Sequence, residues 1–244
     1  AHVVAMVALF RPGPMDFIPD YIARMHGDQP VTYRHPALKP IFEETYGYPV
    51  YQEQLMFAVM DLAGYSAPEA DDLRKAVAKK IKSKLVKHEA KFVKGAIKNG
   101  ISESIAREIF SDWEEFARYG FNKAHAADYG TIAVQTAYLK AHYAIEYMTA
   151  VLSVNQNDTS KVALYVADCR RMGITVAPPD VNASGWDFTV EDRRDRPSQI
   201  RFGLGAVKNV GHAPVDAILE GRLDQPFKDL NEFTHRVDLR HVGR

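Results

Sequence analysis

Residues 63–80 read AGYSAPEADDLRKAVAKK and predict where one helix ends and the next begins. Gly64 ends the first helix, because glycine readily adopts the left-handed conformation that closes a helix. Ser66 is the expected N-cap of the second helix, and Glu69 stands three positions later, where it completes a capping box. The second helix is expected to continue through the following lysines until Asn99-Gly100 stops it. These signals indicate a mainly helical fold.

Helical patterns continue on both sides of this stretch. Residues 1–50 are rich in proline and glycine, which predicts short helices separated by turns. Further helices are expected over residues 53–63, from Ser102 to Phe116, and from Thr159 or Ser160 to Gly173, with a loop over residues 117–128. A long helix after that loop is expected to bury one apolar face in the core, formed by Val134, Tyr138, Ala141, Ile145, Met148 and Leu152.

The pattern changes after Gly173. Residues 174–177, 188–190 and 200–202 are short runs that favour β-strands, and turn residues separate them. Helix and hairpin signals return from Gly203 to Arg222. We therefore expect a mainly α protein: a multi-helix domain over residues 1–173, followed by a small α+β region over residues 174–244.

Composition limits the class of protein. The chain has 244 residues, a hydrophobic fraction of 46% and equal numbers of basic and acidic residues, 31 of each, which is typical of a globular protein of one or two domains. No uncharged apolar run reaches the roughly 18 to 20 residues that span a bilayer, so no membrane association is expected. Cys169 is the single cysteine, which fits a reducing cytoplasm. The absence of an initiator methionine suggests an excised piece.

The zero net charge conceals a local excess of positive charge. Between Arg74 and Lys98 there are ten basic residues and one acid, Glu89, so the balance is 10 − 1 = +9 over 25 residues. On a single helix, Lys75, Lys79 and Lys82 would form one row of cations, and Arg74 would share another face with Ala78 and Ile81. Such a row suits a triphosphate or a nucleic-acid backbone. A merely solvated basic face is the alternative.

Two other segments carry groups that suit a nucleotide. In Tyr119–His125, the rings of Tyr119 and Phe121 could stack on a base while Asn122 and His125 donate hydrogen bonds. Alternatively, Phe121 belongs to the core and the two polar side chains cap helices. The segment Tyr51-Gln52-Glu53-Gln54 could likewise read bases or cap a helix.

Motifs of several enzyme classes are absent from the sequence. It contains no HExxH, no GxSxG and no phosphate-binding GxxxxGK[ST] loop. Asp71 and Asp72 are adjacent and would point apart on a helix, so they do not form the convergent carboxylates of a two-metal site. We expect no catalytic residue and no metal ligand in this chain.

Read in order, several stretches resemble the catalytic α subunits of bacterial replicative DNA polymerase III. They are ALFRPGPM at 8–15, YQEQLM at 51–56, residues 63–80, YGFNKAHAADYG at 119–130, QTAYLKAHYAIEYMTAVL at 135–152, CRRMGITVAPPDVN at 169–182 and FGLGAVKNVG at 202–211. The resemblance implies the fingers region, followed by the start of a helix-hairpin-helix region. The family is a DNA-directed DNA polymerase, a nucleotidyltransferase that uses palm carboxylates and Mg²⁺. Those carboxylates precede the fingers, so the isolated chain is expected to be inactive.

The resemblance also assigns roles to individual residues. It implies binding of the incoming deoxynucleoside triphosphate by Arg74, Lys75, Lys79, Lys80, Asn122, Lys123, His125, Gln52 and Gln54. The chain departs from the usual pattern at Lys75, Ala78 and Ala124, where arginine, glycine and serine are common. Lys75 therefore lacks the bidentate fork of arginine. Asp128 stands where a small residue is usual, and the sequence does not explain it.

The remaining basic residues are assigned to DNA. Lys82, Lys84 and Lys87 are expected to bind primer–template DNA, as are Lys208 and Gly211 in a helix-hairpin-helix whose helix start holds a phosphate. That region is expected to include Gly243-Arg244. The implied partners are DNA, deoxynucleoside triphosphates and the remaining domains of the subunit. Replisome subunits and the sliding clamp would bind elsewhere.

Three hypotheses stay open at this point. The first is part of a polymerase that binds nucleotide and primed DNA. The second is a non-catalytic nucleic-acid-binding module whose basic helix holds only backbone phosphates. The third is a structural scaffold with a solvated basic face, which would bind neither DNA nor nucleotide.

Overall fold

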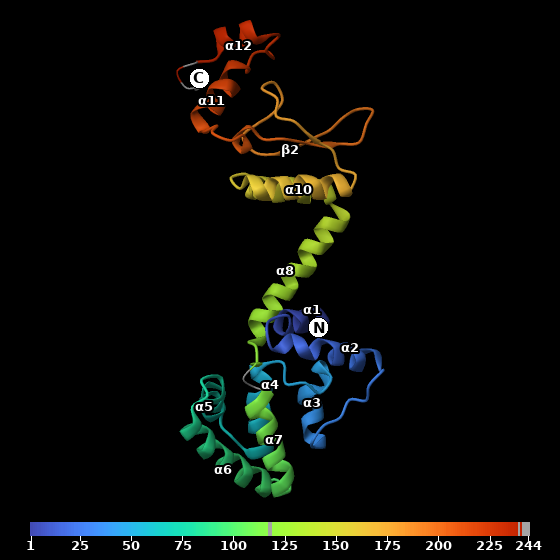
Figure 1. Cartoon of the computed structure of the whole chain (residues 1–244), viewed down its shortest axis with the longest axis vertical. Coiled ribbons are helices and arrows are strands. Elements are labelled where there is room, and N and C mark those ends of the chain that lie inside the picture. The colour runs from blue at the N-terminus through green and yellow to red at the C-terminus, as the bar shows by residue number, and fades with distance from the viewer. Residues whose placement is uncertain (117–118, 239, 241–244) are drawn as a thin grey trace. The chain divides into compact units, whose positions relative to one another are not determined.

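A computed structural model describes residues 1–116, 119–238 and 240 (Figure 1). The chain folds as two compact units, Ala1–Gln135 and Thr136–Arg244, which are described separately. Residues 117 and 118 of the expected loop, and the C-terminal Gly243-Arg244, lie outside the described residues. The expected fold class, mainly helical with a small sheet, is confirmed.

The first 50 residues form short helices joined by turns, as the prolines and glycines predict. The elements are α1 (His2–Leu9), η1 (Pro14–Phe17), α2 (Ile18–His26), η2 (Pro36–Leu38), α3 (Lys39–Phe42) and η3 (Glu43–Thr45). Gly13 and Gly27 have φ angles of 98° and 83°, a conformation that favours glycine. Around α1, a small core forms from buried residues that include Leu9, Tyr21 and Tyr51.

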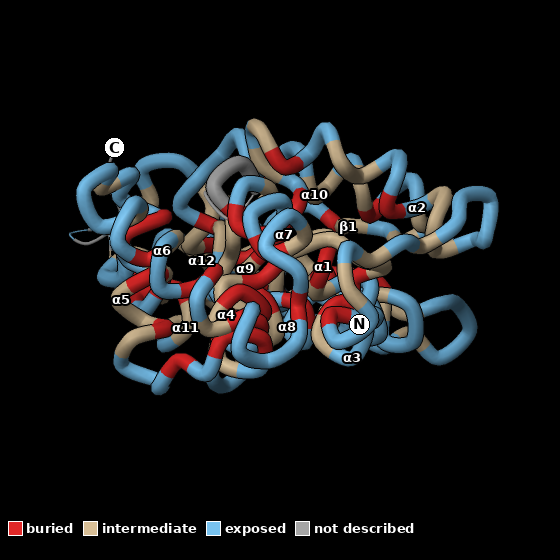
Figure 2. Tube along the Cα trace, turned by 90° about the horizontal axis from the view of Figure 1, so that it is seen from below, coloured by how far each residue is buried: buried red, intermediate tan, exposed pale blue. Residues whose placement is uncertain are grey.

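Four longer helices form the larger core of the first unit. They are α4 (Gln52–Ala63), α5 (Ala67–Ala78), α6 (Lys82–Lys98) and α7 (Glu103–Phe116). Helix α4 packs against α5 and α6, and α6 packs against α7. Leu62, Leu73, Phe92 and Ile109 are almost completely buried between them. In Figure 2 the buried positions recur along the helices between exposed ones, as amphipathic helices require.

The single helix expected from Ser66 to Lys98 is wrong, because the chain turns between α5 and α6. Lys80 has a φ angle of 52°, and the backbone N–H of Ile81 donates to the carbonyl of Ala76 at 3.0 Å. The N–H of Lys80 also donates to the carbonyl of Val77, at 3.1 Å. These two bonds form a Schellman motif, which satisfies carbonyls at the helix end. The expected rows of side chains therefore do not continue on one helix face.

Two expectations about the next helices also need correction. Helix α8 (Lys123–His142) begins inside the loop expected over residues 117–128, because Asn122 caps it. The apolar stripe is interrupted where α8 gives way to α9 (Ala144–Val154) at Tyr143. Met148 and Leu152 are buried as expected, but Val134 and Tyr138 are 55% and 56% exposed. The stripe is therefore not one continuous core face.

The second unit contains a small sheet. Helix α10 (Thr159–Arg171) precedes β1 (Val176–Ala177), β2 (Thr189–Glu191) and β3 (Gln199–Arg201). Strand β3 lies in the middle, parallel to β1 and antiparallel to β2, and Ile200 pairs with both Val176 and Val190. Ile200 and Phe188 share a core with Met148 and Leu152 of α9. The domain boundary expected near residue 174, where the character of the sequence changes, stays a prediction.

The last elements form a separate core in the second unit. They are η5 (Leu204–Ala206), α11 (His212–Gly221) and α12 (Leu230–Arg236). Leu204, Val215 and Phe227 are buried between them. Among the described residues, no helix is both long enough and apolar enough to cross a membrane.

Gly95 provides a test of the core of the first unit. A Cβ atom there would lie 2.3 Å from the carbonyl oxygen of Ala63, because α6 crosses the end of α4 at this point. Alanine favours a helix over glycine by about 1 kcal/mol, but overlap with the backbone of α4 outweighs that gain. We predict that Gly95→Ala lowers the free energy of unfolding by about 1–3 kcal/mol. Chemical denaturation measures it, with the exposed Lys94→Ala as control; an unchanged midpoint would show that the two helices separate freely.

Candidate nucleic-acid interface

The start of α4 lies beside the segment that leads into α8. Tyr51 and Phe121 form a parallel backbone bridge. The N–H of Gln52 donates to the carbonyl of Phe121 at 2.9 Å, and the N–H of Phe121 donates to the carbonyl of Val50 at 3.0 Å. The segments Tyr51–Gln54 and Tyr119–His125, which the sequence singles out, are thus neighbours.

Gln52 connects both segments to the basic residues of α5. Its Nε2 donates to the carbonyl of Gly120 at 3.0 Å, and its Oε1 accepts from Nη1 of Arg74 at 3.0 Å. Arg74 also donates to Oδ1 of Asp71 from Nε and Nη2, at 2.9 and 2.7 Å. The guanidinium is therefore held in one orientation, while 28% of the side chain stays exposed.

The basic residues of α5 differ in how they are neutralised. Lys75 shares Asp71 with Arg74, at 2.6 Å. Hydrogen bonds from Lys75 and Arg74 lower the pKa of Asp71, so this carboxylate stays charged. Lys79 and Lys80 are exposed and make no ion pair within the described part of the chain. The turn after α5 therefore carries uncompensated positive charge.

In the segment Tyr119–His125, the polar residues bond to carboxylates or cap a helix. Oδ1 of Asn122 accepts from the N–H of His125 at 2.8 Å, which caps α8, and its Nδ2 donates to Glu53 at 3.0 Å. The backbone N–H of Lys123 donates to the same carboxylate, and its Nζ pairs with Glu44 at 2.7 Å. Capping, the alternative considered for Asn122, is confirmed.

Aromatic rings surround His125, which is itself exposed. Its ring lies 5.6 Å from that of Phe121 and 4.7 Å, edge to face, from that of Tyr129. Phe121 is partly buried against the core around α1. The packing of Phe121 agrees with the core alternative, whereas contacts of His125 with a nucleotide stay a prediction.

Gln54 is inside the protein, with 2% of its surface exposed. Its Oε1 accepts from the N–H of Tyr51 at 2.9 Å, as in a capping box. Its Nε2 donates to Thr45 and to the carbonyl of Ile41. The capping alternative therefore describes Gln54, and a direct role in nucleotide binding stays a prediction.

The first lysines of α6 form a second basic group. Lys82 and Lys87 are exposed, whereas Lys84 pairs with Asp72 at 2.5 Å. Hydrogen bonds from Lys84 and from His88 lower the pKa of Asp72. Further along, Lys91 pairs with Glu69 and lowers the pKa of that carboxyl to about 2. Helices α5 and α6 are thus joined by ion pairs that leave Lys82 and Lys87 for solvent or a ligand.

The sequence pattern does not indicate the contacts that Arg11 makes. Nε of Arg11 donates to the carbonyl of Ala8 at 2.8 Å, and Nη2 donates to the carbonyl of Tyr119. The guanidinium lies 4.8 Å from the centre of the Phe121 ring, and burial lowers the pKa of Arg11. The sequence pattern also does not indicate that Glu44 and Glu53 bond to Lys123, because only the fold brings these residues together. The only sequence signal at Arg11 is that it directly precedes Pro12-Gly13-Pro14, a segment that cannot continue a helix.

Lys208 and Gly211 belong to the second unit. Gly211 is the N-cap of α11, and Asn209 before it has a φ angle of 67°. Lys208 is exposed, and the rings of His212 and Trp186 stack with centroids 3.5 Å apart. A helix start with a nearby lysine suits a phosphate.

A resident magnesium ion does not fit the described residues of this chain. They contain no group of three or more histidine, cysteine, aspartate or glutamate side chains that could hold a metal. Asp71 and Asp72 bond to different cations, Arg74 and Lys84, because adjacent side chains of a helix point about 100° apart. We therefore derive no metal-dependent step from these residues.

Lys80 allows backbone strain to be separated from charge. A side chain in the left-handed conformation costs about 1–2 kcal/mol, which glycine avoids, while glycine itself costs about 0.5–1 kcal/mol in unfolded-state entropy. We predict that Lys80→Gly raises the free energy of unfolding by up to about 1 kcal/mol. Lys79→Gly is the matched control: its φ of −94° needs no glycine, so it lowers the same quantity. Urea denaturation compares them, and a loss of stability in Lys80→Gly would show that its side chain holds the turn.

The sequence of the chain is similar to those of known proteins along its whole length. Residues 1–100 match the bacterial DNA polymerase III alpha subunit finger domain, and residues 173–244 match a helix-hairpin-helix motif. The DNA polymerase III subunit alpha of Thermus aquaticus is 50% identical over 99% of this chain and 20% of its own length. That of Chlamydia trachomatis is 47% identical over 100% of the chain and 19% of its own length. That of Neisseria meningitidis serogroup A is 46% identical over 100% and 21%.

The chain spans about a fifth of the length of the curated relatives it matches. The finger-domain match and these relatives lead to the same kind of protein. The chain belongs to the bacterial DNA polymerase III alpha subunit family, in which it corresponds to the finger domain and a helix-hairpin-helix motif.

Proposed function

We propose that this chain is the part of a replicative DNA-directed DNA polymerase that binds the incoming deoxynucleoside triphosphate and the primer–template DNA. The supporting observation is the position of Gln52, which bonds to Arg74 of the basic helix and to Gly120 beside the aromatic segment. Phosphate-binding cations and stacking groups thereby adjoin one another. A nucleotide needs both kinds of group at once.

In this proposal the triphosphate lies against the end of α5. Arg74 keeps a fixed orientation through Gln52 and Asp71, so its guanidinium offers hydrogen-bond donors without first losing rotamer freedom. Lys75, Lys79 and Lys80 add positive charge where pyrophosphate leaves. Lys79 and Lys80 have no ion pair among the described residues that must break before a phosphate binds, whereas Lys75 must first leave Asp71.

The segment Tyr119–His125 would contact the sugar and base of the nucleotide. His125 is exposed between the rings of Phe121 and Tyr129 and can bond to a sugar or base. Lys123 reaches a phosphate only by leaving Glu44, an exchange of one anion for another. Asn122 and Gln54 act by holding the segment and the start of α4 in place.

DNA would bind to the second basic group and to the second unit. Lys82, Lys84 and Lys87 at the start of α6 neutralise backbone phosphates, and Lys208 with the N–H groups at Gly211 holds another phosphate. The palm carboxylates, their Mg²⁺ and the replisome contacts belong to the rest of the subunit, which works on chromosomal DNA in the cytoplasm. The isolated chain with primer–template, Mg²⁺ and nucleotides should give no extension product; extension would contradict this division of roles.

A non-catalytic module that holds only DNA backbone is the second candidate, because Lys82 and Lys87 are exposed without acidic partners among the described residues. In the absence of nucleotide, backbone phosphates of DNA would also occupy Lys79 and Lys80 at the turn after α5. Our proposal expects a triphosphate to displace the DNA from this turn, whereas in a module that holds only backbone the nucleotide would compete poorly with DNA. Competition by a deoxynucleoside triphosphate against a labelled duplex separates the two candidates.

Salt dependence tests the role of the turn. We predict that Lys79→Ala combined with Lys80→Gly weakens primer–template binding and reduces the slope of log K against log salt by about 1 to 2, since each phosphate contact contributes about 0.9. Fluorescence anisotropy of a labelled duplex at several salt concentrations measures the slope. Lys94→Ala with Lys98→Ala removes the same charge from the far end of α6 and should change the slope less. Equal effects of the two pairs would mean that the turn is not a specific contact.

A further inference from the structure

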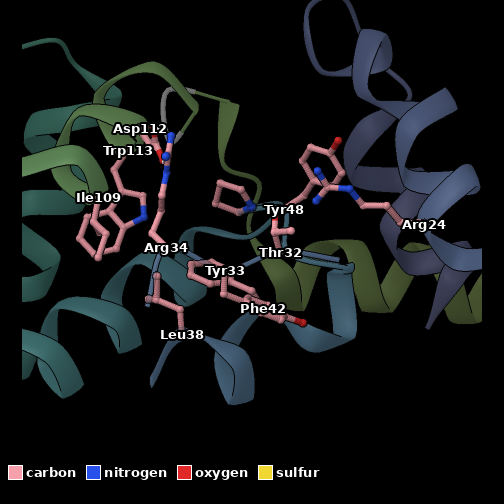
Figure 3. A pocket seen from close by; sticks show the side chains of 12 residues that line it. Arg24, Thr32, Tyr33, Arg34, Leu38, Phe42, Tyr48, Ile109, Asp112 and Trp113 are labelled. Atoms are coloured by element: carbon pink, nitrogen blue, oxygen red, sulfur yellow. Dashed lines mark hydrogen bonds and ion pairs between the residues drawn. The ribbon is translucent and has the colours of Figure 1, made fainter. Parts of the chain in front are cut away.

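The first unit contains a cavity of about 470 Å³ between the segment from Arg24 to Pro49 and helix α7. Figure 3 shows Arg24 and Tyr48 at one side and Arg34, Asp112 and Trp113 at the other, with Tyr33 and Phe42 between them. Its volume falls in the range of roughly 300–1,000 Å³ that is usual for ligand pockets. None of the residues assigned to nucleotide or DNA lines it.

The two arginines of this cavity differ in charge balance. Arg34 is fully engaged: Nε and Nη2 donate to Asp112 at 2.9 and 3.3 Å, and Nη1 donates to Glu108 at 3.3 Å. Two carboxylates therefore surround one guanidinium, which leaves this side of the cavity negative. A polyphosphate or a nucleic-acid backbone would be repelled there.

Arg24 has no carboxylate partner among the described residues. Its Nη1 donates to the carbonyl of Tyr46 at 3.0 Å, and its guanidinium lies 4.3 Å from the centre of the Tyr48 ring. Its Nε is shielded from solvent and makes no hydrogen bond. The guanidinium therefore lacks a charge partner within the described part of the chain, and a carboxylate that enters the cavity would supply one through a charge-assisted hydrogen bond.

We propose that this cavity binds a peptide segment of a partner protein in which an acidic residue stands beside a large apolar one. The apolar side chain would occupy the space between Tyr33, Phe42 and Trp113, and the carboxylate would pair with Arg24. A single carboxylate matches the single unpaired guanidinium, and the acids around Arg34 exclude more highly charged ligands. Interface hot spots are enriched in tryptophan, tyrosine and arginine, the residue types that line much of this cavity.

Trp113 provides the readout, since it lines the cavity and the chain has two tryptophans. In a Trp186→Phe background of the full chain, a panel of short peptides is titrated to millimolar concentration. The panel places Asp or Glu next to Phe, Leu or Trp in both orders, and Trp-containing peptides are followed by calorimetry instead. We expect saturable binding that weakens about tenfold or more when the acid becomes its amide, or when Arg24 becomes Gln.

Two further variants control the interpretation. Arg107→Gln removes the same charge from α7 outside the cavity and should leave peptide affinity unchanged. Thr32→Phe fills the cavity from an exposed position that lines it, and should abolish binding while the circular dichroism spectrum stays intact. The proposal is overturned if no peptide of the panel binds, if Arg107→Gln weakens binding as much as Arg24→Gln, or if a single-stranded oligonucleotide binds in an Arg24-dependent manner.

Discussion

The candidate interface depends on the backbone bridge between Tyr51 and Phe121, because the bonds of Gln52 and Glu53 to the segment before α8 require it. The bridge fixes the start of α4 against the segment that leads into α8. Gln52 can then reach Gly120 and Arg74, and Glu53 can reach Asn122 and the N–H of Lys123. Peptide hydrogen bonds between segments about 70 residues apart thus position side chains from three parts of the sequence.

Carboxylates around the site orient its cations more than they stabilise the fold. Asp71, Asp72 and Glu44 hold Arg74, Lys84 and Lys123, but these pairs are partly exposed to solvent and stabilise the fold only weakly. A phosphate can therefore replace such a carboxylate at little cost. The turn after α5 differs, since Lys79 and Lys80 have no carboxylate to leave. A ligand meets uncompensated charge there first.

Local signals in the sequence predicted local structure well. The capping box of Ser66 and Glu69 is confirmed, with the N–H of Ser66 donating to Glu69 at 3.0 Å, and so is the end of α4 before Gly64. The break at Lys80 was missed because neither glycine nor proline marks it. The short β runs were predicted, but their pairing order was not. The family resemblance named the residues of the site, while the bonds of Glu44 and Glu53 to Lys123 depend on long-range packing that no spacing reveals.

A double-mutant cycle for nucleotide binding tests most directly whether Gln52 positions Arg74 for the triphosphate. The dissociation constant of a deoxynucleoside triphosphate is measured on the complete subunit that contains this chain, with primer–template bound, for Gln52→Ala, Arg74→Ala and the pair. We predict that the double variant loses less affinity than the two single losses combined, with a coupling free energy of about 1 kcal/mol. Losses that add within about 0.3 kcal/mol would contradict the account, because Arg74 would then act independently of Gln52.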